Sequence, residues 1–282
     1  MAKTKTKKQT KGKFPRRGLP WFVWLVIALG IAGIVIGVRM YPLGKPAGST
    51  QSGELKAAII DQLYTLQPNQ DFIQQATQDL EDYGFKVDVY RGEGVTVDLY
   101  RKLPTYGYKL IIFRAHSGIL GLEEGPNVEE TETTYLFTGE TYTTTKRVFE
   151  QLFDQILPAQ MTEDYPKVFA VNSRFILKSL EGEFQHTIII MMGCSTAYKS
   201  DMAQAFVQKG ASVYLGWSAT VGLDYIDKAT LSLISNLCAK DMPVEEALAQ
   251  MVTEVGLDPD YHAHPKYYPA EAGDKTIARL IR

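Results

Sequence analysis

The sequence contains few cysteines and few histidines. Of its 282 residues, two are cysteine (Cys194 and Cys238) and four are histidine. Two cysteines in a domain of this size do not make a disulfide scaffold, although one Cys194–Cys238 disulfide is an open alternative. Cys238 lies in the apolar helical pattern LSLISNLCAK, and we predict that it is a core residue.

Phosphate-binding loops and metal-ligand clusters are missing as well. Neither G-x-x-x-x-G-K-[ST] nor G-x-G-x-x-G occurs. His262 and His264 have the spacing of two ligands on one strand face, but no cysteine or carboxylate cluster completes a site, so we expect a polar loop. Asp224 and Asp227 are three apart on a predicted helix, and we expect them on its solvated face, with a place at the border of the pocket near Cys194 as the alternative. The sequence therefore predicts no metal site.

Acidic residues are absent before Glu54, whereas the first fifty residues hold ten Lys and Arg. The rest of the chain carries 20 bases against 32 acids, a formal net charge of −12. An acidic domain lacks the basic surface that nucleic-acid binding requires, so we expect no nucleic-acid partner.

Charge is also absent from residues 19–38, LPWFVWLVIALGIAGIVIGV. About twenty apolar residues of helix span a bilayer core, and Trp21 and Trp24 near one end fit a membrane interface. Eight bases precede the segment, so the positive-inside rule predicts a cytoplasmic tail (1–18) and an extracytoplasmic main domain. A cleaved signal peptide is the alternative, but no convincing small-x-small cleavage site follows. We therefore predict a single-pass membrane protein of the cell membrane.

A linker and one large domain follow the predicted transmembrane helix. Residues 39–53 are rich in Gly, Pro and Ser and are typical of a linker, and the domain is predicted at 54–282. Apolar strand patterns alternate with helical patterns in this domain, which predicts an α/β fold with a three-layer sandwich and a mostly parallel sheet. We expect strands at 55–60, 85–90, 109–113, 168–171, 187–192 and 211–217, a hairpin of TYLF and TYTT within 117–145, and helices at 69–84, 95–103, 146–157, 200–210, 222–239 and 243–255.

Two of the predicted strands end in reactive side chains. KLIIFRAHSG places His116 just past one strand, and TIIIMMGCS places Cys194 just past another. The carboxyl ends of parallel strands meet at one edge of a sheet, so we expect these residues to lie together. A thiolate and an imidazole are the pair that nucleophilic catalysis uses. Either residue alone is more often a packed or satisfied core residue, and only the joint pattern favours chemistry.

These two segments, together with GASVYLGWSATVGLDYID, resemble the caspase-like cysteine peptidase superfamily, in particular its separase, CHAT-domain and gingipain-like branches. The resemblance covers roughly residues 55–240, and its specific part is about fifty residues. It implies a caspase-like sheet, His116 as base, Cys194 as nucleophile, and the amides of Gly118 and Cys194 as an oxyanion hole. This chain has His-Ser-Gly where the family most often has His-Gly, so the sequence departs from the family pattern at Gly118.

The resemblance also bears on the substrate. In several branches an acidic residue at the end of the first strand accepts a basic substrate side chain, and Asp61 has that position here. Asp61 as a turn or cap residue is the equal alternative. We expect a membrane-anchored cysteine endopeptidase that acts on a peptide or protein and needs no cofactor. If Asp61 accepts a basic side chain, the enzyme should cleave after basic residues. The alternative is a non-catalytic caspase-like sensor or scaffold at the membrane.

Overall fold

The computed structural model describes residues 54–120 and 133–282. They belong to one compact unit, Ser52–Arg282. The predicted tail (1–18), transmembrane helix (19–38) and linker (39–53) lie outside the described residues. Within the described part of the chain, no helix is long and apolar enough to cross a membrane.

A six-stranded sheet, sheet A, forms the centre of the unit and has the order β10-β9-β8-β3-β1-β2. Five strands of sheet A are parallel to one another, and the sixth, β10, pairs antiparallel with β9. The central strands are buried along their whole length, as continuous apolar runs in a parallel sheet require. The strands of sheet A are β1 (Lys56–Asp61), β2 (Lys86–Arg91), β3 (Leu110–Arg114), β8 (Thr187–Met191), β9 (Ala211–Trp217) and β10 (Pro265–Tyr268).

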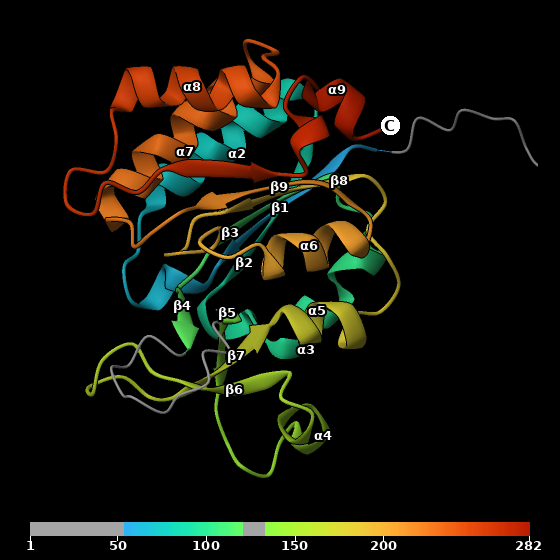
Figure 1. Ribbon diagram of the computed structural model, residues 1–282, viewed down its shortest axis with the longest axis vertical. Coiled ribbons are helices and arrows are strands. Elements are labelled where there is room, and N and C mark those ends of the chain that lie inside the picture. The colour runs from blue at the N-terminus through green and yellow to red at the C-terminus, as the bar shows by residue number, and fades with distance from the viewer. Residues whose placement is uncertain (1–53, 121–132) are drawn as a thin grey trace, which may run out of the picture. The chain divides into compact units, whose positions relative to one another are not determined.

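Helices cover both faces of sheet A (Figure 1). Alternate residues of β1, β3 and β8 pack into two separate apolar clusters. One cluster joins the sheet to α2 (Gln70–Tyr83), α7 (Leu223–Cys238), α8 (Val244–Val255) and α9 (Ile277–Leu280). The other joins it to α3 (Val97–Lys102), α5 (Ser173–Ser179) and α6 (Asp201–Gln208). The predicted mixed α/β fold with a mostly parallel sheet is confirmed.

The predicted boundaries of α2 follow from local chemistry. The Asn69 side chain accepts a hydrogen bond from the Phe72 amide at 3.0 Å, which caps the start of the helix. Gly84 ends the helix with φ 109°, in the left-handed region that glycine adopts without strain. Short 3-10 helices connect other elements: η1 (Gln62–Thr65), η2 (Gly92–Gly94), η3 (Leu103–Tyr106) and η4 (Ala270–Ala272).

A second, antiparallel sheet differs from the sequence-based expectation. Sheet B has the order β4-β5-β7-β6, with β4 (Ser117–Leu120), β5 (Thr133–Thr141), β6 (Ile156–Ala159) and β7 (Val168–Asn172). The hairpin predicted from TYLF and TYTT is wrong, because β5 is one strand that pairs with β4 and β7 instead of folding back. The helix predicted at 146–157 is α4 (Val148–Leu152), and the apolar residues after it pair with β7 as β6. Apolar spacing alone does not separate a short helix from an edge strand.

Candidate functional site

His116 and Cys194 follow neighbouring strands at the same end of sheet A. Phe113 of β3 is in register with Met191 of β8, so His116 and Cys194 each lie three residues past a paired position. The Met192 amide donates to the Phe113 carbonyl at 2.9 Å, which continues the contact beyond the strands. The two segments therefore meet at the carboxyl edge of the sheet, as predicted.

A direct hydrogen bond ties the two segments together. The Ser117 hydroxyl donates to the carbonyl oxygen of Cys194 at 2.6 Å. Gly193 allows this approach, since a Cβ atom there would lie 2.7 Å from the Ala115 carbonyl oxygen and would run into the Ser117 hydroxyl. Glycine is thus required next to the cysteine by close packing.

His116 is half-buried between two supports. Its backbone amide donates to Gln62 Oε1 at 2.9 Å, and its ring centroid lies 6.0 Å from that of Phe137 on β5. Its Nε2 atom is buried without a hydrogen-bond partner among the described residues. Burial lowers the pKa of His116 to about 4, and the nearby Arg114 cation acts in the same direction. The ring is therefore neutral at pH 7 and has a buried nitrogen free to bind a proton or a ligand.

Cys194 has a different local partner. Its thiol donates to the Val221 carbonyl at 3.8 Å, and burial together with the negative charge of Asp258 raises its pKa above the ordinary value. Cys194 and Cys238 are both free, so the alternative of a disulfide between them is excluded in this structure. Cys238 is buried, as predicted.

The residue after Cys194 has a strained backbone. Ser195 has φ 55°, which is uncommon outside glycine, and its amide donates to the Ala219 carbonyl at 2.8 Å. Strain of this kind persists only where the surrounding structure imposes it, and it is concentrated at functional sites. The loop around Ala219 and Val221 thus fixes the turn that presents Cys194.

Gly118, predicted as an oxyanion donor, belongs to the ladder of sheet B. Gly118 is paired with Tyr135 of β5. Two residues earlier in the chain, the carbonyl oxygen of His116 accepts a hydrogen bond from the Phe137 amide at 2.9 Å. Hydrogen-bonded positions alternate along an antiparallel pair, so the Gly118 amide faces β5. By the same alternation the Ser117 amide faces away from β5, at the edge of sheet B.

Asp61, predicted to receive a basic substrate side chain, is occupied within the chain. It is fully buried, and its Oδ1 atom accepts from Arg114 at 2.9 Å. Arg114, also fully buried, donates through two nitrogens to Asp227 at 2.9 Å each. A carboxylate that is buried and paired in this way offers no open surface to a substrate cation.

Three contributors to the site were missed in the sequence. Arg114 interrupts the apolar run of β3, and a lone charge inside such a run signals a buried ion pair. Gln62 and Ser117 have no comparable signal, because their partners are distant in sequence. The prediction of Asp227 on a solvated helix face is wrong. Asp227 is only 5% exposed, because its side chain is hydrogen-bonded to Arg114 and Asn69.

The remaining candidates do not form a site. His262 and His264 are exposed, and His264 immediately precedes β10. Among the described residues, no group of three His, Cys, Asp or Glu side chains is arranged to hold a metal ion. The chain matches no model of a known protein family and no curated protein.

Proposed function

We propose that the protein is a membrane-anchored cysteine endopeptidase of the caspase-like class, with Cys194 as nucleophile and His116 as general base. The observation that carries this proposal is the pairing of β3 with β8, which gives two strands in register that lead to His116 and Cys194. The buried, unpartnered Nε2 atom of His116 supports it further, because a buried polar atom without a partner is rare in a purely structural role.

The charge states indicate general-base catalysis rather than a preformed ion pair. With the pKa of His116 at about 4 and that of Cys194 raised, imidazole and thiol are both neutral at pH 7. His116 Nε2 takes the thiol proton as sulfur attacks the substrate carbonyl carbon, and the new C–S bond gives a tetrahedral oxyanion. His116 returns the proton to the leaving amine, which leaves a thioester. Water then attacks the thioester, and His116 accepts its proton and gives it to the departing thiolate.

One movement must precede the attack. The thiol hydrogen bonds to Val221, and no hydrogen bond joins it to His116 among the described residues. In the proposed mechanism the thiol therefore has to leave the Val221 carbonyl and reach the imidazole before the attack. Catalytic hydrogen bonds are often absent before substrate binds, so this geometry is compatible with a resting enzyme.

Paired cysteine variants test the proposal. Cys194→Ala should abolish peptide hydrolysis and labelling by thiol-directed acyl probes, because no other nucleophile replaces the sulfur. Cys238→Ala is the matched control, since Cys238 is buried in α7 and should affect stability but not turnover. Undiminished hydrolysis by Cys194→Ala would contradict the assignment.

A second candidate function is a non-catalytic caspase-like sensor or scaffold at the membrane. The raised pKa of Cys194, which burial causes, favours it, because a raised thiol pKa opposes thiolate formation. The two candidates differ in the rate of thiol alkylation. An endopeptidase should lose reactivity at Cys194 when His116 is replaced by Gln, whereas a scaffold should show slow alkylation that does not depend on His116.

A further inference from the structure

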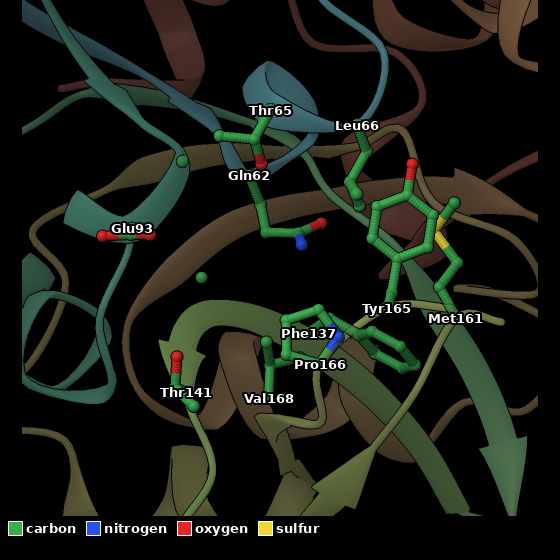
Figure 2. A pocket seen from close by; sticks show the side chains of 12 residues that line it. Gln62, Thr65, Leu66, Glu93, Phe137, Thr141, Met161, Tyr165, Pro166 and Val168 are labelled. Atoms are coloured by element: carbon green, nitrogen blue, oxygen red, sulfur yellow. The ribbon is translucent and has the colours of Figure 1, made fainter. Parts of the chain in front are cut away.

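A cavity of about 260 Å³ is lined in part by Gln62 and Phe137, two residues that contact His116. It lies between η1, η2, strand β5 and the segment that leads into β7 (Figure 2). This volume is slightly below the roughly 300–1,000 Å³ of sites that hold drug-sized ligands. The cavity is therefore the size for one large side chain rather than for a cofactor.

Two residues of the cavity wall also hold His116. Gln62 lines the cavity, and its Oε1 atom accepts the His116 amide at 2.9 Å. Phe137 lines the cavity as well, and its amide donates to the His116 carbonyl at 2.9 Å. A ligand in the cavity would thus touch the two groups that position His116.

The lining is mainly apolar. Its apolar side chains are Leu66, Phe137, Met161, Tyr165, Pro166 and Val168. Its polar groups are Gln62, Thr65 and Thr141, and Glu93 is its one charged residue, exposed to water. Water screens an exposed carboxylate, so apolar contact outweighs charge in this cavity.

Gln62 adds one directional contact. Its side chain reaches into the cavity from the end of β1 (Figure 2). The Gln62 side-chain oxygen already accepts a hydrogen bond from the His116 backbone amide. The NH₂ group of the Gln62 side chain is therefore left to donate to a ligand. An extended peptide offers a carbonyl oxygen next to each side chain, which suits such a donor.

We infer that this cavity binds a large apolar side chain of a peptide, such as leucine, methionine or phenylalanine, next to His116. The inference deepens the proposed endopeptidase function and rests on it for the identity of the ligand as a substrate. It also assigns a preference opposite to the basic one expected from Asp61.

Direct binding is measured on the full chain in detergent, carrying Cys194→Ala so that no turnover occurs. The probes are N-acetyl-phenylalanine amide, N-acetyl-leucine amide and N-acetyl-arginine amide, and the readout is the ring signals of ¹³C-labelled histidine. The chain has four histidines, so His116→Gln assigns the signal. The two apolar probes should shift the His116 signal saturably. Their dissociation constants should be at least tenfold lower than that of the arginine probe.

Thr141→Trp fills the cavity and should weaken binding of the apolar probes at least tenfold. Thr144→Trp is the matched control, because Thr144 is exposed and lies outside the lining, and it should bind as the parent does. Tyr165→Ala removes one wall at a site already 37% exposed, so it should weaken binding without affecting folding.

Three results would each overturn the inference. They are tighter binding of the arginine probe than of the apolar probes, no saturable shift with the apolar probes, and unchanged binding in both Thr141→Trp and Tyr165→Ala. Hydrolysis by the wild-type chain is measured separately. Specific binding without any hydrolysis leaves the cavity assignment standing and removes the endopeptidase. Hydrolysis with the same side-chain preference in wild type and Thr141→Trp removes the cavity assignment and leaves the endopeptidase.

Discussion

His116 carries a charge state set by burial, and this gives a measurable pH dependence. Its folded pKa is about 4, whereas an unperturbed histidine has a pKa near 6.5. Between these values the unfolded chain binds more protons than the folded chain, so the free energy of unfolding rises with pH. The difference corresponds to roughly 3 kcal/mol of stability that is present above pH 6.5 and lost by pH 4.

Replacement of His116 by Gln should remove this dependence. In chemical denaturation of residues 52–282 at pH 4 and pH 7, His116→Gln should lose about 3 kcal/mol less stability on acidification than the wild type. His264→Gln is the matched control, because His264 is exposed, and it should behave as the wild type. Equal acid sensitivity of wild type and His116→Gln would show that the buried ring does not titrate in this range.

Gly193 is the residue whose size decides the approach of the two segments. Gly193→Ala places a Cβ atom 2.7 Å from the Ala115 carbonyl oxygen, and backbone cannot move aside cheaply. We expect a loss of about 1–3 kcal/mol in the free energy of unfolding, as for overpacking in a core. Gly118→Ala is the control, because nothing lies within 4 Å of its added carbon, and it should be nearly neutral by the same denaturation measurement.

At the scale of elements, Arg114 joins three segments at the carboxyl edge of sheet A. It pairs with Asp61 at the end of β1 and with Asp227 of α7, and it also donates to the Gln67 carbonyl at 3.0 Å. The two carboxylates are not equivalent. Asp227 receives two hydrogen bonds from Arg114, whereas Asp61 has one buried oxygen, Oδ2, with no hydrogen-bond partner in the described part of the chain.

This asymmetry predicts unequal costs of substitution. Arg114→Met leaves two buried carboxylates without a cation and should cost about 3–5 kcal/mol in the free energy of unfolding. Asp61→Asn removes a poorly satisfied charge and keeps the bidentate pair with Asp227, so it should cost about 1 kcal/mol or less. Thermal unfolding of the two variants checks the order, and a larger loss for Asp61→Asn would contradict the pairing seen here.

The elements that the sequence predicted best have one-sided or continuous apolar patterns. β3 and β8 are buried and mostly apolar, and α2 has both a cap and a stop, so local chemistry specifies them. The errors are in sheet B, where β5 and β6 depend on partners far along the chain. The ion pairs of Asp61 and Asp227 could not be predicted for the same reason, because Arg114 is 53 residues from one and 113 from the other.

At the scale of the whole molecule, the predicted transmembrane helix gives a separate test. The full chain should remain with membranes after washing at alkaline pH, and deletion of residues 19–38 should release it, because those residues hold the apolar span. Deletion of residues 2–18 is the control, since it removes eight bases and keeps the span. Membrane retention after loss of residues 19–38 would contradict an anchor in that segment.

The sequence alone determined the alternation of strands and helices and the positions of His116 and Cys194 directly after two apolar strands. Backbone propensity, apolar periodicity and capping act over a few residues, so they can be recognised without a structure. The tertiary structure alone decided that β8 returns beside β3 after the chain has built sheet B, that Arg114 pairs with Asp61, and that a cavity forms next to Gln62 and Phe137. These features depend on contacts between residues far apart in the chain, where packing and desolvation rather than local propensity set which groups meet.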